Sequence, residues 1–292
     1  MGLTFILGNA SQDHQQELLE QMLALKEADP QGKFYFIVPD HVKFGTEVKI
    51  LDMLRQQAGV EQQATFATNQ VQVYSFTRLA WYFLKDQPVY QVPRLSQAGT
   101  NMLVTKILQD KGDDLRLFRG EKNQPGFVAK LVTQMNDLRA ANISSADLQE
   151  LIPQVAPDAG QQTDLQAKLT DLALVYREYE HYLQGKYTDN AAILTALAAY
   201  FTQADLSHTY FFLDKAYRYN ALEEQVLQVL FQRAAQVFVA LVLDQPSSKL
   251  PDPSSFYLRT GRTYFRLNQL ARAKGVAVRN LAVQQHRITA PG

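Results

Sequence analysis

The loop after the first apolar run of the sequence holds residues that could meet a phosphate. A nucleotide-binding fold places GxxxxGK[ST] between its first strand and first helix, where backbone amides and the lysine cradle phosphates and the hydroxyl binds Mg²⁺. Residues 8–15 read GNASQDHQ: Gly8 keeps the first glycine position, but Asp13, His14 and Gln15 replace glycine, lysine and Ser/Thr. Because the Asp13 carboxylate would repel phosphate, we expect a degenerate loop that hydrolyses no ATP. The alternatives are a simple strand-to-helix turn and the divergent phosphate loop of an ATPase or kinase.

Aromatic and basic side chains are interleaved between Phe76 and Trp81. Proteins hold single-stranded nucleic acid by stacking aromatic rings on bases, at about 1–3 kcal/mol per base, and by placing basic side chains on phosphates. Phe76, Arg78 and Trp81 supply both kinds of group, and positions 78 and 81 share a face of a helix. In the other interpretation both rings pack in the core and Arg78 is solvated. The neighbouring apolar positions, which include Leu79 and Ala80, form an alternative core-facing stripe and so favour binding.

Further candidates follow other predicted strands, at the edge of an open parallel sheet where ligands approach. His41 and Lys43 follow the second strand and would contact guanine acceptors or phosphates, or else form an ordinary polar loop. Asp214 ends a later strand, where an active motor would hold Mg²⁺. Because the first turn has no phosphate-binding lysine, a structural capping role is the favoured interpretation of this carboxylate. A second aromatic and basic cluster comes next, formed by Tyr217, Arg218 and Tyr219.

The densest basic stretch lies near the C-terminus, where Arg259, Arg262 and Arg266 share a helical face. This face is either a phosphate-tracking surface or a plain solvated surface. Over the whole chain 29 basic residues balance 29 acidic ones, so any DNA site must be local. The chain has no cysteine and its five histidines form no metal motif, which excludes disulfides and thiolate metal sites. It also lacks the clustered carboxylates and lysine of a Mg²⁺-dependent nuclease, so we expect no exonuclease activity from this segment.

An α/β fold has to position these candidates. Short apolar runs predict buried strands at residues 3–7, 34–38, 71–74, 209–213, 237–243 and 276–278. Three strand-helix pairs open the chain, with Ser75 placed to N-cap a helix over 76–84, which indicates a parallel sheet covered on its faces. Helical spacing predicts helices at 12–26, 96–110, 126–140, 145–152, 161–185, 189–202, 221–233 and 260–273. We therefore expect a discontinuous α/β domain, 1–90 and 203–292, with a helical insertion at 91–202.

The two ends of the sequence carry expectations of their own. The N-terminus lacks the basic start and the cleavage pattern of a signal peptide, and no stretch approaches the roughly 18 apolar residues that span a bilayer. We therefore expect a cytoplasmic protein with no membrane partner. The C-terminal QHRITAPG has no folding signal and is interpreted as a cut within a longer protein.

Five blocks of the sequence, in order, resemble the N-terminal region of the AddB/RexB family, the B subunits of bacterial ATP-dependent helicase/nuclease complexes. The blocks are FILGNAS (5–11), FIVPDHVKF (36–44), VQVYSFTRLAW (71–81), FFLDKAYRY (211–219) and LRTGRTYFRL (258–267). VYSFTRLAW is the most specific of them, and the similarity in order and spacing extends over essentially the whole chain. The sequence departs from the family where His41 and Lys43 replace frequent Gln and Thr. It departs again at Lys215, which follows Asp214 in a stretch that resembles a DGF pattern.

The resemblance implies a P-loop NTPase-like fold of RecA-like, superfamily 1 helicase-like type, with an all-helical insertion. It implies that the partner, an AddA/RexA-type helicase-nuclease, is the motor, and that this part of the AddB-type chain scans the emerging single strand of DNA for the Chi sequence. It places Phe76, Arg78 and Trp81 on the scanning surface. The complex would act in double-strand break repair and homologous recombination, with ATP and Mg²⁺ as cofactors of the complex and none in this segment. Its 5′→3′ nuclease would lie in a C-terminal domain outside this chain. The remaining alternative is a scaffold whose aromatic and basic residues serve the interface with the AddA/RexA-type partner.

Overall fold

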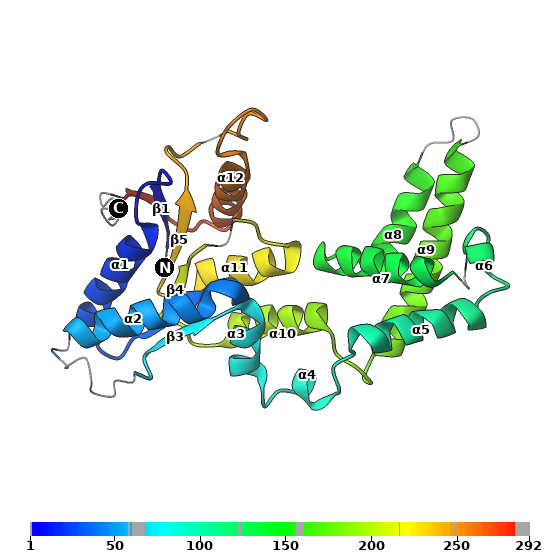
Figure 1. The fold of residues 1–292 in the computed structure, drawn as a ribbon, viewed down its shortest axis with the longest axis horizontal. Coiled ribbons are helices and arrows are strands. Elements are labelled where there is room, and N and C mark those ends of the chain that lie inside the picture. The colour runs from blue at the N-terminus through cyan, green and yellow to red at the C-terminus, as the bar shows by residue number, and fades with distance from the viewer. Residues whose placement is uncertain are drawn as a thin grey trace, which may run out of the picture. The chain divides into compact units, whose positions relative to one another are not determined.

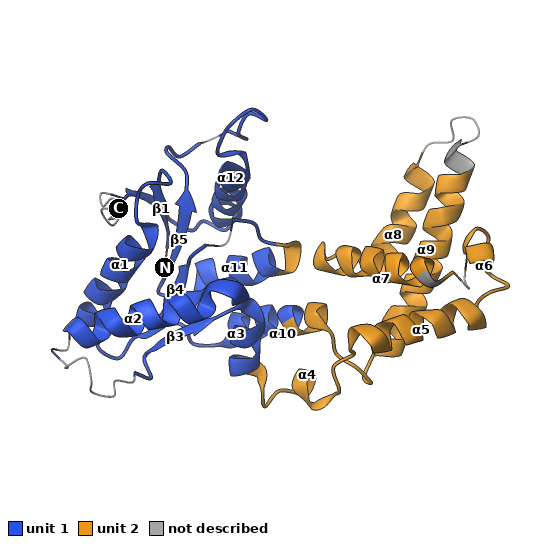
Figure 2. Cartoon of the chain, viewed as in Figure 1, with its two compact units in different colours: residues 1–83, 194–219, 223–292 blue, residues 84–193, 220–222 orange. Residues whose placement is uncertain are grey.

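The computed structural model describes residues 2–57, 59, 68–121, 124–155, 161–215, 217–247 and 249–283 (Figure 1). The C-terminal QHRITAPG, for which the sequence shows no folding signal, lies outside the described residues. The chain divides into two compact units (Figure 2): unit 1 comprises residues 1–83, 194–219 and 223–292, and unit 2 comprises 84–193 and 220–222. Among the described helices, none has both the length and the apolar character that a membrane span requires.

Unit 1 is built on a sheet of six described strands, in the order β3-β2-β4-β5-β1-β6, and every neighbouring pair is parallel. The strands are β1 (Leu3–Gly8), β2 (Lys33–Ile37), β3 (Val71–Tyr74), β4 (Thr209–Leu213), β5 (Gln236–Val242) and β6 (Val278–Ala282). Strands of a parallel sheet are covered on both faces, which explains their nearly continuous apolar sequences. The α/β fold and the parallel sheet are confirmed. The strand predicted at 276–278 is wrong in position, because β6 is a half-exposed edge strand without a continuous apolar run.

The two faces of the sheet carry alternate side chains of the same strands, as the period of two in a strand requires. One face packs on α1 (His14–Ala28) and α2 (Lys43–Gln57) through a buried cluster that includes Leu18, Met22, Ile50, Leu54, Ile6, Phe36 and Phe212. The other face presents Phe5, Tyr35 and Phe211. Their rings contact Tyr264 of α12 (Leu258–Ala273) at 4.5 Å, Phe83 of α3 (Phe76–Leu84) at 5.4 Å and Phe201 of α10 (Asn190–Gln203) at 6.0 Å.

Side-chain caps fix where the first helices of unit 1 begin. The amide of Arg78 donates to Ser75 Oγ at 3.4 Å, so the N-cap predicted for α3 is confirmed. Asp13 caps α1, since its carboxylate accepts from the amide of Gln16 at 3.0 Å. A short 3₁₀ turn, Asp40–Val42, precedes α2, and α11 spans Ala221–Arg233. These starts place the residues that follow each strand at defined positions.

The described part of unit 2 is helical. Its helices are α4 (Pro88–Gln91), α5 (Gln97–Asp110), α6 (Phe118–Glu121), α7 (Pro125–Ala140), α8 (Ser145–Leu151), followed by a 3₁₀ turn (Ile152–Gln154), and α9 (Gln161–Leu183). Four of these agree with the predicted helices to within two residues, whereas the short α4 and α6 were not predicted. A buried cluster of side chains from α5, α7, α8 and α9 forms its core.

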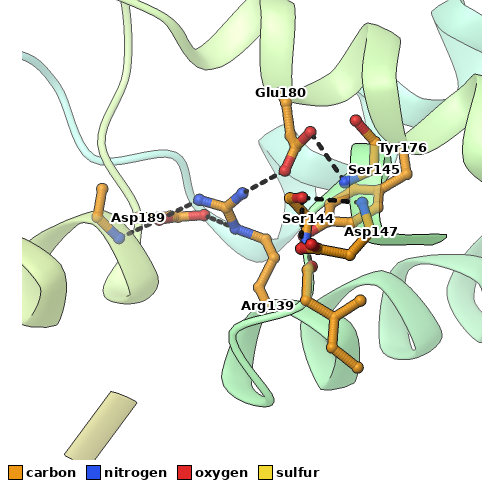
Figure 3. A network of polar contacts seen from close by, with 9 residues as sticks. Arg139, Ser144, Ser145, Asp147, Tyr176, Glu180 and Asp189 are labelled. Atoms are coloured by element: carbon orange, nitrogen blue, oxygen red, sulfur yellow. Dashed lines mark hydrogen bonds and ion pairs between the residues drawn. The ribbon is translucent and has the colours of Figure 1, made fainter. Parts of the chain in front are cut away.

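A half-buried arginine lies in a network that joins four segments of unit 2 (Figure 3). The Nη2 of Arg139, near the end of α7, donates to Asp189 Oδ1 at 2.9 Å, and its Nη1 lies 3.8 Å from Glu180 Oε1 on α9. Glu180 in turn accepts from the amide of Ser145 at 3.3 Å. Because the partners come from α7, α8, α9 and the start of α10, we infer that this network stabilises the packing of these segments within unit 2.

Candidate nucleic-acid interface

The candidate residues of unit 1 follow the carboxyl ends of four strands. Residues 8–15 follow β1, 38–43 follow β2, 75–81 follow β3 and 214–219 follow β4. Since all of these strands are parallel, their carboxyl ends meet at the same edge of the sheet. Two pockets open at this edge, and Lys215 and Tyr217 line both of them. This edge is where ligands approach open parallel sheets.

The first-turn pocket, of about 300 Å³, lies beside the degenerate loop. The residues that line it come from the start of α1, from α2, from β5 and from the segment after β4, and include Asp13, His14, Gln15, Lys49, Asp214 and Lys215. Four of these six were candidates from the sequence, but they came from two separate observations, the loop after the first strand and the end of a later strand. The fold brings them into one pocket.

The loop after β1 is filled by its own Gln12. A Cβ built on Gly8 would lie 2.4 Å from Gln12 Oε1, so the glutamine side chain occupies the space directly over this glycine. Gln12 Oε1 accepts from the amide of Asn9 at 2.8 Å, and Gln12 Nε2 donates to the carbonyl of Val283 beside β6. The amide of Ser11 donates to Asn9 Oδ1 at 2.9 Å. Backbone amides that cradle phosphates in a phosphate loop are here bonded to side chains of the loop itself.

Asp13, His14 and Gln15 have local partners. Asp13 caps α1 and forms an ion pair of 3.3 Å with Lys49 Nζ. The ring of His14 is buried between two carbonyl oxygens, with Nε2 3.1 Å from Gly8 O and Nδ1 3.1 Å from Gln12 O. Gln15 Nε2 donates to Thr46 Oγ1 of α2 at 3.3 Å. These side chains stabilise the turn and its contact with α2.

Asp214 is buried at the end of β4 with one carboxylate oxygen unsatisfied. Only 4% of the residue is exposed, and its Oδ2 has no hydrogen-bond partner among the described residues. Burial raises the pKa of the Asp214 carboxyl, and the positive charge of Lys215 and its backbone amide oppose this rise. Lys215 adopts φ 59°, in the left-handed region that side-chain-bearing residues rarely enter. In the described part of the chain, no group of three or more His, Asp or Glu side chains is placed to hold a metal ion.

The strand-end pocket, of about 360 Å³, lies at the carboxyl ends of β2, β3 and β4. Phe76, Tyr217, Arg218 and Tyr219 all line it, so two clusters that are distant in the sequence meet here. The rings of Phe76 and Tyr219 make an edge contact at 6.1 Å. Tyr217 is 48% exposed, which leaves one face of its ring accessible.

Tyr219 is the buried member of the strand-end pocket. It is 7% exposed, and its hydroxyl has no hydrogen-bond partner among the described residues. Burial, together with the charges of Glu223 and Asp214, raises the pKa of this hydroxyl above its ordinary value. The hydroxyl therefore remains protonated and available as a donor at neutral pH.

Arg78 and Trp81 stack on one another outside the two pockets. The guanidinium carbon of Arg78 lies 4.2 Å from the centroid of the Trp81 ring, an arrangement that suits a cation–π interaction. Trp81 is 40% exposed and Arg78 is exposed, whereas Leu79 and Ala80 are fully buried. The interpretation of Trp81 as a core residue is therefore wrong, and the core-facing stripe next to it is confirmed.

His41 and Lys43 lie at the same edge of the sheet, in the 3₁₀ turn and at the first residue of α2. His41 is exposed and Lys43 is half-buried, and neither is among the residues that line the two pockets. Their role in contacting DNA stays a prediction. Pro39 and Asp40, just before them, do line the strand-end pocket.

Two lysines of the interface were not singled out as site residues from the sequence. Lys49 lies in the middle of α2, 36 positions from its partner Asp13, and no local pattern indicates this pairing. Lys215 differs, because it stands where the DGF-like pattern has a glycine, and glycine tolerates the left-handed backbone conformation that Lys215 adopts. The lysine at this position was the feature of the sequence that could have identified it as a site residue.

Comparisons with known proteins show which family this chain is similar to. The family model described as "ADDB, N-terminal" matches residues 5–290. A protein of Levilactobacillus brevis, named as the B subunit of an ATP-dependent helicase/deoxyribonuclease, is 43% identical over 95% of this chain and 23% of its own length. Proteins of the same name from Lactiplantibacillus plantarum and Enterococcus faecalis are 40% and 34% identical over 100% and 99% of the chain. Each of these two is covered over 24% of its length, so the chain spans about a quarter of these relatives.

Proposed function

The chain belongs to the AddB N-terminal family, and we propose that it forms the single-stranded-DNA-binding part of the B subunit of a heterodimeric ATP-dependent helicase/deoxyribonuclease. In this proposal the motor is the partner subunit, of AddA/RexA type, and this segment receives the strand that the motor releases. It scans that strand for Chi during double-strand break repair and homologous recombination. The segment itself hydrolyses neither ATP nor DNA.

The strand-end pocket is the observation that carries the DNA-binding proposal. Its volume of about 360 Å³ is lined by three aromatic side chains, Phe76, Tyr217 and Tyr219, and by Arg218. Stacking on aromatic rings and contact of cations with phosphates are the two means by which proteins hold single strands. The stacked Arg78 and Trp81 lie on the same helix as Phe76 and offer a second aromatic face with a cation attached.

A RecA-like origin of the fold is supported by the positions of the loop and of Asp214. The loop follows β1 and Asp214 follows β4, two strands that are separated only by β5. Both line the first-turn pocket, where a RecA-like motor would hold the phosphates and the Mg²⁺ of ATP. We propose that the pocket has been retained without its nucleotide, because Gln12 fills the loop and Asp13 pairs with Lys49.

The proposal predicts that the chain binds oligothymidylate and that Trp81 reports the binding directly. Trp81 is the single tryptophan of the sequence, so quenching of its fluorescence by DNA arises at this position. Trp81→Ala should remove about 1–3 kcal/mol of stacking energy, about 5- to 150-fold in affinity, measured by anisotropy of a labelled oligonucleotide. Arg78→Ala should weaken binding and reduce its dependence on salt.

A matched control distinguishes this surface from general basic attraction. Arg233 is an exposed arginine of unit 1 that precedes β5, at the opposite, amino-terminal edge of the sheet, and Arg233→Ala should leave affinity unchanged. Equal affinity of wild type, Trp81→Ala and Arg78→Ala would exclude the proposed surface. Co-purification with an AddA/RexA-type partner in the absence of any DNA affinity would instead support the scaffold function.

The absence of a nucleotide function is tested separately by isothermal titration with Mg-ATP. The expected result is no heat of binding, because the amides of the loop and the space over Gly8 are already occupied by side chains. Clear micromolar binding would favour a divergent P-loop ATPase or kinase and overturn this part of the proposal.

A further inference from the structure

Positive charge is concentrated on α12, although the chain as a whole is neutral. Residues 258–274 contain five arginine or lysine residues and no aspartate or glutamate, against 29 basic and 29 acidic residues in the complete sequence. A local excess of this kind, on a single helix, is the electrostatic pattern of a nucleic-acid contact. Neither the strand-end pocket nor the first-turn pocket includes any of these cations.

The helix divides cleanly into a buried face and a cationic face. Its buried residues are Thr260, Gly261, Thr263, Tyr264, Leu267, Asn268 and Ala271. Arg259 and Arg262 are exposed, and within the described chain no carboxylate lies within 4.0 Å of either guanidinium. Arg266 on the same face is paired with Glu224 at 2.9 Å, so its charge is already compensated. Two adjacent arginines are thus available to an external anion.

An exposed aromatic ring precedes these arginines in the sequence, just before α12 begins. Phe256 is 103% exposed, the most exposed of the large apolar side chains of the described chain. An exposed ring close in sequence to two exposed arginines offers the aromatic face and the cations by which proteins hold single strands. The acidic residue nearest in sequence, Asp252, accepts from Ser254 and does not neutralise the arginines.

A hydrogen bond connects the buried face of α12 to a residue that lines both pockets. Thr263 Oγ1 donates to the carbonyl of Tyr217 at 2.7 Å and also lies 3.2 Å from the carbonyl of Arg259. Tyr217 lines the first-turn pocket and the strand-end pocket. The helix that carries Arg259 and Arg262 is therefore anchored, through Thr263, to a residue that lines both pockets.

We propose that Phe256, Arg259 and Arg262 form a second contact for single-stranded DNA, which we call the exit ladder. Arg259 and Arg262 bind successive phosphates, for which the guanidinium fork is well suited, and Phe256 stacks on a base. The exit ladder rests on the proposed function, because it extends a strand that is already held in the strand-end pocket. The exit ladder binds the sugar-phosphate backbone without regard to sequence, whereas the strand-end pocket binds a base.

The test compares DNA length between wild type and Arg259→Gln/Arg262→Gln. An oligothymidylate of about 4 nucleotides fills the pocket alone, and one of about 16 nucleotides also reaches the exit ladder. The double variant should bind the short strand as wild type does and lose the extra affinity of the long strand. For the long strand, the slope of log K against log[salt] should fall in magnitude by about 1.4, or about 0.7 per phosphate contact. Between 50 and 200 mM salt, wild type should then lose about sevenfold more affinity than the variant.

The controls separate failure of the exit ladder from failure of the proposed function. Arg272→Gln removes an exposed arginine from another face of the same helix and should behave as wild type, and Phe256→Ala should reduce affinity for the long strand alone. If wild type binds neither length, the proposed function fails. If wild type binds both lengths and the double variant matches it in affinity and salt slope, the exit ladder alone is overturned. Loss of co-purification with an AddA/RexA-type partner, with unchanged DNA affinity, would assign the face to a protein interface and also overturn it.

Discussion

Substitution of Gly8 tests whether Gln12 fills the loop after β1. In Gly8→Ala the new Cβ would lie 2.4 Å from Gln12 Oε1 and 3.2 Å from His14 Nε2. The glutamine is the flexible partner, so it should swing away, and with it go two hydrogen bonds, from the Asn9 amide and to the Val283 carbonyl. The strand-to-helix turn would then lose its link to the segment after β6.

The magnitude follows from those two bonds. A net contribution of about 0.5–1.5 kcal/mol each predicts that Gly8→Ala lowers the free energy of unfolding by about 1–3 kcal/mol. Gln12→Ala removes the same two bonds and should cost a similar amount. In the double variant the clash with Gln12 no longer exists, so its cost should be close to that of either single variant. The coupling free energy of this double-mutant cycle should therefore be about 1–3 kcal/mol.

Urea denaturation followed by circular dichroism measures all four corners of the cycle. Gly45→Ala is the matched control, because a Cβ there meets nothing within 4 Å and the position lies in α2, where alanine stabilises by about 0.5–1 kcal/mol. If the costs of Gly8→Ala and Gln12→Ala simply add in the double variant, Gln12 does not fill the space over Gly8. A stabilising Gly8→Ala would lead to the same conclusion, since it would show that the space over the glycine is empty in solution.

Three further outcomes are expected from charged groups elsewhere in the chain. His208 Nδ1 lies 2.9 Å from Asp29 Oδ2, and the pair raises the pKa of His208 above 6.5 and lowers that of Asp29 below 3.8. The stabilisation by this pair is therefore fully present between pH 3.8 and pH 6.5, the ordinary pKa values of the two groups, and it disappears as pH rises through the raised pKa of His208. The difference in Tm between wild type and His208→Gln should therefore be larger at pH 6 than at pH 9. The carboxylate of Asp171 accepts hydrogen bonds from the amides of Arg116, Leu117 and Phe118 at 2.8–3.0 Å. Asp171→Ala should therefore lower the free energy of unfolding, measured by urea denaturation, by about 3 kcal/mol or more, and Asp171→Asn should lower it by less. Equal and small effects of the two substitutions would contradict this expectation. Since burial raises the pKa of Asp214, ionisation of this group costs stability above its ordinary value of 3.8, and Asp214→Asn should raise Tm at pH 8 but not at pH 4.

The sequence predicted the fold well where apolar periodicity decides it. Five of the six strands and the helix α3 were located to within one residue, because a parallel sheet buries both faces of its strands and leaves continuous apolar runs. The edge strand β6 was misplaced, because Arg279 and Asn280 interrupt its apolar pattern. The single-turn helices α4 and α6 give too short a period to be recognised.

The candidate site was predictable in its location and less so in its contacts. The rule that parallel strands end at one edge was enough to group residues that follow β1, β2, β3 and β4. It could not show that Phe76 would meet Tyr219 or that Asp13 would meet Lys49, since these pairs are set by packing across the sheet. Nor could it separate His41 and Lys43, which share the edge, from the residues that line the pockets.

The segment after β4 combines three features that each oppose folding. Asp214 buries a carboxylate with one oxygen unsatisfied, Lys215 holds a left-handed backbone conformation that costs about 1–2 kcal/mol, and Tyr219 buries an unpartnered hydroxyl. Unfavourable groups of this kind persist where the surrounding structure serves a function, and here all three lie on the two pockets at the carboxyl edge of the sheet. The degenerate loop shows the opposite behaviour, because its polar groups are paired with one another. We infer that Asp214, Lys215 and Tyr219 are the residues of this edge whose cost to folding points to a function.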